Sequence, residues 1–233
     1  MVREWKEIKN FEKWNEEMAK KHNPDYYFNR GGFLIRFLEE KRRKTISKIL
    51  EVAENNEVIE IGCGTGHILE IIEKGHLTGL DLSEFLLGLA KEKLKDKKVN
   101  LVKGDAQNLP PEIRNKKFDK IICSELLEHV PHPEKVIDEI LKIAHPKSVV
   151  VISIPNEKVI NKFKKAFINL KIFSILFPNI PRQIGYEWHL HNLDLDTLKR
   201  ITYRKLKITK IKALPFLFLP IRYVVKFEPC KIR

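Results

Sequence analysis

The feature that most constrains the fold is the ten-residue stretch from Glu57 to Gly66, with the sequence E-V-I-E-I-G-C-G-T-G. Residues 58–61 indicate a short buried strand, and the apolar spacing at 68–72 indicates a helix after it. Between them lie three glycines at alternate positions, Gly62, Gly64 and Gly66. Glycine takes positive φ without strain and leaves no side chain between the backbone and a ligand. The stretch therefore predicts a strand, a ligand-binding turn and a helix.

The spacing of the glycines distinguishes this turn from one that binds dinucleotides. In the dinucleotide fingerprint the third glycine follows the second by three residues, so that a pyrophosphate sits on the helix N-terminus. Here the third glycine follows the second by two residues, and Glu60 lies two residues before the first. A carboxylate at this place favours a ligand with an ammonium group and a ribose. The alternative is an ordinary strand, turn and helix of an α/β protein.

The segment E-I-G-C-G-T-G resembles the first motif of the class I S-adenosylmethionine (SAM) methyltransferases. In that family the glycine loop lies against the methionine part of SAM. We expect Cys63, inside the loop, to act as a small neutral residue. The resemblance implies that the loop binds the cofactor through Glu60, Gly62, Cys63, Gly64 and Gly66.

Two aspartates follow the glycine loop at strand ends. A second strand is predicted over 76–80, and it runs into Asp81, 19 residues after Gly62. An acidic side chain at this spacing accepts hydrogen bonds from the ribose hydroxyls of an adenosine ligand. A third strand over 99–103 is followed by Asp105. In the family such an aspartate binds the adenine amino group. The resemblance also places Leu82 and Ala106 at the cofactor.

The predicted fourth strand, residues 118–124, runs into S-E-L-L-E-H-V-P-H-P. Ligands in parallel sheets sit beyond the carboxyl ends of the strands, so we expect Ser124, Glu125 and His129 to face the active site. The segment resembles the one that borders the transferred methyl group in small-molecule methyltransferases, which places Ser124 at the cofactor. Transfer to a hydroxyl requires removal of its proton. His129 is the predicted base, and Glu125 is the second catalytic candidate.

The same segment leaves a metal site open as an alternative. Glu125, Glu128 and His129 lie at i, i+3 and i+4, and a later histidine, His189 or His191, could complete a cation site. The E-x-x-E-H pattern resembles two families that hold a divalent ion, the small-RNA 3′-terminal 2′-O-methyltransferases and the ubiquinone-pathway O-methyltransferases. It also occurs in family members that use no metal. We expect no metal, and the candidate ligands for a divalent cation are Glu125, Glu128, His129 and His191.

The flanks of this core are predicted to cover it. Residues 1–50 form helices, and Tyr26, Tyr27 and Arg30 either fold over the cofactor or pack on the sheet. Residues 157–193 form an insertion that caps the substrate pocket. Its apolar stripe, flanked by lysines, either packs on the body or meets a membrane interface or lipid-like substrate. A helix at 195–203 and antiparallel strands at 207–214 and 221–227 follow, and the apolar patch at 215–223 is predicted as a loop and edge strand.

The charge is unevenly distributed along the chain. Of a net charge of +13, residues 157–233 carry 17 Lys and Arg against 5 Asp and Glu. An anionic substrate, nucleic acid or a membrane surface suits this distribution, although heavy Lys, Glu and Ile usage with two glutamines is also typical of thermophile proteins. Nucleic acid is not favoured, because no nucleic-acid module signature is present. The composition does not indicate an oligomeric state.

The location of the protein is predicted from what the sequence lacks. No apolar run reaches the about 20 residues that span a bilayer, and the N-terminal residues have no signal-peptide core. Three scattered cysteines, Cys63, Cys123 and Cys230, indicate reduced thiols. These features predict a cytoplasmic protein.

Together these observations predict a single α/β domain with a doubly wound, seven-stranded, mostly parallel Rossmann-like sheet. Residues 51–156 are its SAM-binding core, between a helical cap at 1–50 and the cap and C-terminal elements at 157–193 and 194–233. The predicted function is methyl transfer from SAM, which becomes S-adenosylhomocysteine, to a small-molecule or lipid-precursor acceptor. The alternatives are a metal-dependent RNA 2′-O-methyltransferase and a non-catalytic protein that binds SAM or docks on a membrane.

Overall fold

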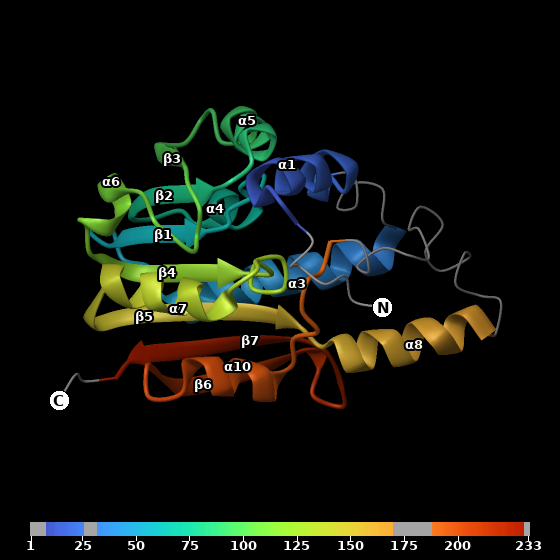
Figure 1. The fold of residues 1–233 in the computed structure, drawn as a ribbon. Helices are drawn as coiled ribbons and strands as arrows, with labels where there is room; N and C mark the ends of the chain where they lie inside the picture. Colours follow the sequence, from blue (N-terminus) through green and yellow to red (C-terminus); the bar gives the residue numbers. More distant parts are fainter. Residues whose placement is uncertain (1–7, 26–31, 170–187, 231–233) are drawn as a thin grey trace.

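The computed structural model describes residues 8–25, 32–169 and 188–230 (Figure 1). Seven strands form one sheet in the order β3-β2-β1-β4-β5-β7-β6. The strands from β1 to β5 pair in parallel, whereas β7 runs antiparallel to both β5 and β6. The predicted mostly parallel, seven-stranded fold is therefore confirmed. The strands are β1 (Glu57–Ile61), β2 (His76–Asp81), β3 (Val99–Lys103), β4 (Phe118–Ser124), β5 (Ala144–Pro155), β6 (Leu206–Phe216) and β7 (Leu219–Pro229).

Helices cover both faces of the sheet. They are α1 (Phe11–Lys21), α3 (Gly32–Leu50), α4 (His67–Ile71), α5 (Glu84–Lys93), α6 (Pro111–Arg114), α7 (Pro133–Ile143), α8 (Glu157–Asn169) and α10 (Leu195–Thr202). In Figure 1, α7 and α10 lie in front of the sheet and α3 lies behind it. Successive residues of a strand point to opposite faces, so each central strand contributes to two cores. Ile121 packs with α7 and α10, whereas its neighbour Ile122 packs with α3 and α4.

The C-terminal strand pair is longer than predicted. Cross-strand pairing continues through Pro215 and Pro220 to Phe216 and Leu219, so the expected loop shrinks to a tight hairpin turn. The patch at 215–223, predicted as a loop and edge strand, includes the end of β6 and the start of β7. In the sheet, β6 forms the edge and β7 lies inside. The fifth strand also begins earlier, at Ala144 instead of Lys147, because Ala144 pairs with Phe118 across an irregularity in the ladder.

The flanking segments are helical where they are described. The expected N-terminal helices are α1 and α3, and the insertion begins with α8. Tyr26, Tyr27 and Arg30, and residues 170–187 of the insertion, lie outside the described ranges. No helix within the described ranges combines the length and the apolar character that a bilayer crossing requires.

Candidate active site

A cavity of about 670 Å³ lies beyond the carboxyl ends of β1, β2 and β4. This volume falls within the range of about 300–1,000 Å³ that is usual for small-molecule sites. The glycine loop and residues 104–106 line one part of the cavity, and residues 124–130 line another. Residues of α3, α8, 188–192 and the C-terminal strand pair also line it. Segments that are far apart in sequence therefore enclose one space.

The three glycines of the loop have different roles. Gly64 lines the cavity with φ of +53°, and a Cβ added there would meet nothing within 4 Å. By contrast, a Cβ on Gly62 would lie 2.8 Å from Leu126, and one on Gly66 would lie 2.7 Å from Leu94. Gly66 precedes α4 and is not part of the cavity wall. The backbone is open to a ligand at Gly64, whereas Gly66 allows close packing.

Asp81 lies at the end of β2 and faces both the cavity and the glycine loop. Its carboxylate accepts hydrogen bonds from the backbone N–H of Gly64 at 2.8 Å and of Ser83 at 2.9 Å. Burial raises the pKa of Asp81 above its usual value, although these hydrogen bonds oppose the rise. Ser83 caps α5 and donates its hydroxyl proton to Glu16 of α1 at 2.6 Å. The N-terminal helix thus helps to hold the turn that presents Asp81.

Glu60 points from β1 toward the glycine loop and is nearly inaccessible to solvent. Only 3% of it is exposed, and among the described residues its Oε2 has no hydrogen-bond partner. Burial raises the pKa of Glu60 to about 8, against the opposing charge of Arg42. A buried carboxylate oxygen without a partner is costly unless a ligand satisfies it. An ammonium group in the cavity would do so, and on this observation the residues fit SAM.

The remaining predicted cofactor residues also reach the cavity. Asp105 accepts a hydrogen bond from the backbone N–H of Gln107 at 2.8 Å. Burial raises the pKa of the Cys63 thiol, which is therefore neutral, as the sequence predicted. The predicted residues that line the cavity are Glu60, Gly62, Cys63, Gly64, Asp81, Leu82, Asp105, Ala106, Ser124, Glu125 and His129. Their individual roles stay predictions.

The segment that follows α1 reaches the glycine loop through Asp25. The Asp25 carboxylate accepts hydrogen bonds from Thr65 Oγ1 and Lys93 Nζ, both at 2.7 Å, and His67 Nε2 also lies 2.7 Å away. Burial opposes ionisation of Asp25, but these three partners lower its pKa well below the usual range. The sequence analysis did not identify Asp25, because its partners lie 40 to 68 residues away.

A network of charged residues forms another wall of the cavity. Arg42 of α3 donates to Ser124 Oγ from Nη1 and to Glu39 from Nη2, both at 2.5 Å. Glu39 also accepts a hydrogen bond from Arg222 of β7. Burial opposes ionisation of Glu39, but the charges of Arg222 and Arg42 lower its pKa to about 2. Sequence reasoning missed this network, although a lone arginine in the apolar sequence I-R-Y-V-V was a signal for it.

Glu125 belongs to the same network. Its backbone has φ of +51°, an uncommon conformation for a residue other than glycine. One carboxylate oxygen lies 3.1 Å from Arg222 Nε, and the other accepts a hydrogen bond from Ser153 Oγ at 3.0 Å. Glu125 is therefore held by partners on β5 and β7, apart from the cluster formed by Glu128 and His129.

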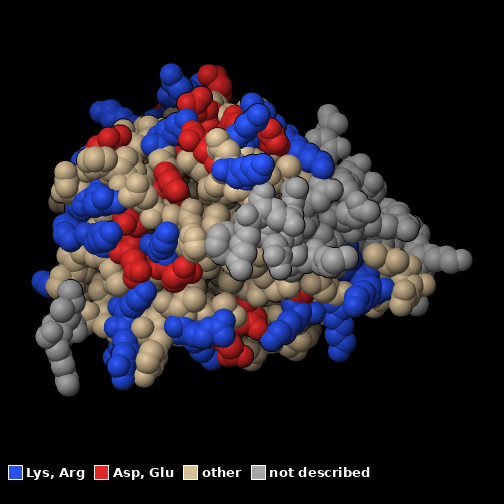
Figure 2. Space-filling view, in the orientation of Figure 1, with Lys and Arg blue, Asp and Glu red and all other residues tan. Residues whose placement is uncertain are grey.

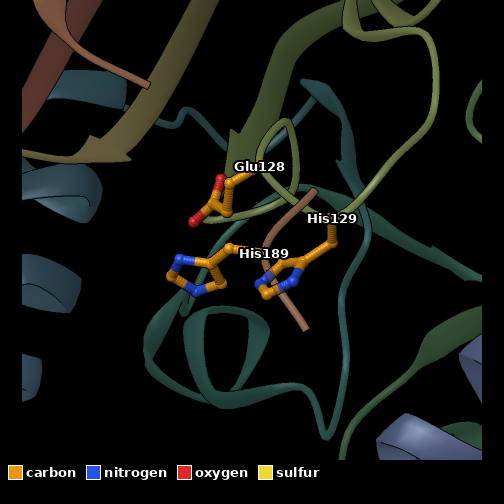
Figure 3. A group of neighbouring side chains, drawn as sticks. All are labelled: Glu128, His129 and His189. Carbon is orange, nitrogen blue, oxygen red and sulfur yellow. The ribbon is translucent and has the colours of Figure 1, made fainter. Parts of the chain in front are cut away.

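Glu128, His129 and His189 converge at the cavity wall (Figure 3). One possible ligand atom from each lies within 4.8 Å of the others. Glu128 is 1% exposed, and among the described residues its Oε2 has no hydrogen-bond partner. Burial and the nearby charge of Glu125 raise the pKa of Glu128 to about 8. Carboxylate and imidazole are ligand types that divalent metals accept, so the cluster is the place in the described structure where a cation could bind.

The two histidines of the cluster have opposite electrostatic surroundings. Burial and the charge of His189 lower the pKa of His129 well below its usual value. His129 Nδ1 lies 3.3 Å from the carbonyl oxygen of Trp188, so Nδ1 carries the proton and Nε2 keeps a lone pair. Burial opposes protonation of His189, but a 2.5 Å hydrogen bond to Glu157 and nearby carboxylates raise its pKa.

The later histidine of the cluster is His189 and not the candidate His191. The backbone N–H groups of Leu190 and His191 both donate to the carbonyl of Glu128, at 2.7 and 3.3 Å. His191 Nε2 lies 3.0 and 3.1 Å from the carbonyls of Val130 and Pro131. The sequence spacing alone allowed either histidine to join the cluster, because spacing does not show which side of this loop faces Glu128.

A sheet of this order, with a glycine loop after β1 and acidic residues after β2 and β3, defines the class I methyltransferase architecture. The family described as a methyltransferase domain matches residues 53–207. The chain therefore belongs to the methyltransferase family, and its resemblance to the class I SAM-dependent enzymes is confirmed.

Two curated relatives show how far the sequence similarity extends. The chain is 36% identical over 103 residues to a ubiquinone biosynthesis O-methyltransferase of Dechloromonas aromatica, which covers 42% of the chain and 44% of the relative. It is 28% identical over 189 residues to a demethylmenaquinone methyltransferase of Staphylococcus haemolyticus, covering 75% and 77%. The first match therefore spans less than half the length of that relative.

Solved structures of low sequence identity share the fold. Magnesium protoporphyrin IX methyltransferase from Synechocystis PCC 6803, with bound S-adenosylhomocysteine, has a TM-score of 0.67 at 14% identity and covers 94% of this chain and 100% of that one. The N-methyltransferase NodS from Bradyrhizobium japonicum, in complex with the same product, has a TM-score of 0.62 at 16% identity and covers 82% and 87%.

Proposed function

We propose that this protein transfers a methyl group from SAM to a hydroxyl of a small-molecule acceptor, of the quinone-precursor kind that the names of the curated relatives indicate. The observation that carries the proposal is the arrangement of Glu60, Gly64, Asp81 and Asp105 around the cavity that His129 also lines. Residues able to hold the cofactor and a residue able to take a proton thus face one space. We also expect the enzyme to act in the cytoplasm.

The cofactor residues have complementary chemistry. SAM supplies an electrophilic methyl group on a sulfonium. The Glu60 carboxylate would pair with its ammonium group, and Asp81 would accept from the ribose hydroxyls. Asp105 would accept from the adenine amino group, and Gly64 leaves room for the ligand against the backbone. Backbone N–H groups hold the carboxylates of Asp81 and Asp105 before any ligand arrives, which reduces the cost of binding.

His129 is proposed as the base for the acceptor. Its Nε2 holds the lone pair, because Nδ1 faces the Trp188 carbonyl. As the acceptor oxygen forms its bond to the methyl carbon, the hydroxyl proton passes to Nε2 and the electrons of the broken carbon–sulfur bond stay on sulfur. A positioned base of this kind contributes a factor of about 10² to 10⁴ in rate. Glu125 would act as a positioning residue, because Arg222 and Ser153 hold its carboxylate.

The metal-dependent alternative rests on the cluster of Glu128, His129 and His189. We do not favour it, because the ligand atoms lie up to 4.8 Å apart. Ligands of a tetrahedral cation bound at about 2.1 Å lie only about 3.4 Å from each other. In that alternative a cation would orient neighbouring oxygens of an acceptor, including the terminal ribose of an RNA.

Isothermal titration with SAM tests cofactor binding first. We expect the wild type to bind and Asp81→Ala to bind at least about tenfold more weakly, because it loses a buried acceptor of two hydrogen bonds. Asp96→Ala, at an exposed aspartate beyond α5, is the matched control and should bind as the wild type does. Absence of SAM binding by the folded wild type would refute the proposal.

Labelled methyl transfer then identifies the acceptor class. The protein is incubated with methyl-labelled SAM and with separate small-molecule, lipid and RNA fractions of cells. We expect label in the small-molecule or lipid fraction. Label in RNA alone would support the alternative, and SAM binding without transfer to any fraction would indicate a non-catalytic protein.

A further inference from the structure

A group of exposed apolar side chains, here called the apolar rim, lies where the start of α3 meets the β6–β7 hairpin. Leu217, Phe218 and Phe33 are 86%, 85% and 80% exposed. Phe33 stacks on Phe37 with a centroid distance of 6.4 Å, and Phe216 stacks on Phe218 at 5.2 Å. In each pair one ring stays mostly in solvent, whereas its partner is less exposed, with Phe37 at 36% and Phe216 at 44%. The apolar rim consists of Phe33, Phe37, Phe216, Leu217 and Phe218.

Lys41 joins the two halves of the apolar rim. Its Nζ lies 5.5 Å from the ring centroid of Phe37 on α3 and 4.5 Å from that of Phe216 on β6. Cations at this distance from an aromatic face are attracted to it. The rim is therefore one surface with a positive charge at its centre.

The apolar rim is continuous with the active-site cavity. Phe37 and Phe216 belong both to the rim and to the cavity wall, and Leu34, which is 38% exposed, also lines the cavity. Phe163 of α8, which is 38% exposed, also lines the cavity. Figure 1 shows the hairpin turn and α8 on the side of the sheet where the parallel strands end. The rim thus forms an apolar border of the cavity that faces outward.

The surroundings of the apolar rim are basic. On α8, next to β7, the side chains of Lys158, Lys162 and Lys165 are exposed. Basic side chains are visible along this helix in Figure 2. Such a surface, with phenylalanine and leucine side chains flanked by lysines, suits the interface of an anionic bilayer. There the apolar groups enter the acyl boundary and the lysines meet the headgroups.

We propose that the apolar rim docks on the surface of an anionic lipid bilayer, with Leu217 and Phe218 of the hairpin turn inserted. Exposed apolar patches that border a ligand cavity mark interaction sites, and the lysines on α8 select an anionic lipid surface as the partner. An acceptor with an apolar tail would then enter the cavity from the membrane without crossing water. This last step rests on the proposed function, whereas the docking itself does not.

Vesicle co-sedimentation tests the docking. The full chain is mixed with vesicles of phosphatidylcholine, or of phosphatidylcholine and phosphatidylglycerol, and the fraction in the pellet is measured at low and high salt. We expect binding to the phosphatidylglycerol vesicles that weakens with salt. The double variant Leu217→Ser with Phe218→Ser should lower the partition coefficient at least about tenfold. Lys162→Gln with Lys165→Gln should lower it about tenfold for the anionic vesicles.

Tyr203→Ser provides the matched control. Tyr203 is 68% exposed, but it lies beyond the opposite end of the 11-residue strand β6, about 30 Å from the hairpin turn. We expect this variant to bind vesicles as the wild type does. SAM titration in the absence of vesicles verifies that each variant is folded, and it tests the proposed function separately.

Three outcomes would overturn the docking proposal. They are equal binding of the wild type and the hairpin variant, equal binding to neutral and anionic vesicles, and no vesicle binding by a wild type that still binds SAM. A wild-type dimer that the hairpin variant dissociates, seen by sedimentation velocity without vesicle binding, would assign the rim to contact between copies of the chain.

Discussion

Arg42 Nη1 donates a hydrogen bond to Ser124 Oγ at 2.5 Å, although the two residues are 82 positions apart in the chain. The contact joins α3, behind the sheet, to the carboxyl end of β4, where the cavity begins. Ser124 Oγ is also 2.8 Å from Ser153 Oγ of β5. The charged network therefore links the N-terminal cap to the central strands at the candidate active site.

Glu39 is predicted to be the residue on which the stability of this network depends. Glu39→Gln leaves Arg42 and Arg222 without their shared carboxylate, and breaking a buried ion pair costs about 3–5 kcal/mol. We expect a loss of about 3 kcal/mol in the free energy of unfolding, measured by urea denaturation. Glu40→Gln, at the exposed neighbouring position, should leave the denaturation midpoint unchanged.

The dependence of stability on acidic pH should differ between the wild type and Glu39→Gln. Because the pKa of Glu39 falls from 4.5 to about 2 in the folded chain, its contribution is present above pH 4.5 and is lost as the pH falls toward 2. Glu39→Gln should therefore lose less stability than the wild type over this window. A parallel loss in both proteins would contradict the assignment.

Glu60 is predicted to make SAM binding dependent on pH. Its pKa is about 8 when the cavity holds no ligand, so the carboxyl is protonated at neutral pH, and pairing with an ammonium group requires the carboxylate. SAM affinity should therefore rise with pH and level off near pH 8, by up to about tenfold per pH unit below that. Titrations in buffers of different ionisation enthalpy should show proton release at pH 7.

Two variants separate Glu60 from Glu128, another carboxyl whose pKa is raised by burial. Glu60→Gln should bind SAM more weakly and without the proton release, whereas Glu128→Gln should keep it. The effect of Glu60 on the stability of the folded chain has the opposite pH dependence to its effect on SAM binding. A carboxyl whose pKa is raised in the folded chain contributes stability below pH 4.5, and this contribution is lost as the pH rises through about 8. Unchanged proton release in Glu60→Gln would show that another group titrates.

His129 is predicted to act in the transfer step and not in cofactor binding. His129→Gln should lower the rate of methyl transfer by a factor of about 10² to 10⁴ and leave the SAM dissociation constant within about twofold of the wild type. The rate is measured with labelled SAM under saturating conditions. His145→Gln, at the start of β5 and paired with Asp119, is the control and should retain full activity. Full activity in His129→Gln would assign the base elsewhere.

Methyl transfer is predicted to survive removal of divalent ions. The ligand atoms of Glu128, His129 and His189 lie up to 4.8 Å apart, which is wider than a bound cation would hold them. We expect activity to stay within about twofold after exhaustive chelation, since an essential Lewis acid would contribute several kcal/mol. Loss of activity on chelation, restored by Mg²⁺ or Mn²⁺ but not in Glu128→Gln, would establish the metal-dependent alternative.

Gly64 and Gly88 provide a matched pair of glycine substitutions. A Cβ added at either position would meet nothing within 4 Å. Gly64, however, has φ of +53° and faces the cavity, whereas Gly88 lies within α5. Gly64→Ala should lower the free energy of unfolding by about 1–2 kcal/mol and weaken SAM binding. Gly88→Ala should raise it by about 0.5–1 kcal/mol and leave binding unchanged. Denaturation and titration of both variants measure the difference.

The parts of the site that could be predicted from the sequence depend on local patterns. Asp81 follows the predicted strand over 76–80, and Asp105 follows the predicted strand over 99–103, and the structure places both strand ends at the cavity. Parallel strands of short βαβ units end at the same edge of a sheet, so the order of these signals was sufficient.

The amino-acid sequence by itself determined the mostly parallel sheet of the core, the turn that is open to a ligand at Gly64 and the acidic residues beside it. Only the tertiary structure decided that Glu39 pairs with Arg222, 183 positions away, and that His189 instead of His191 meets Glu128. The physical reason is the range of the interactions. Backbone periodicity and turn chemistry act over a few residues, whereas ion pairs and loop docking depend on how α3, β7 and residues 188–193 pack.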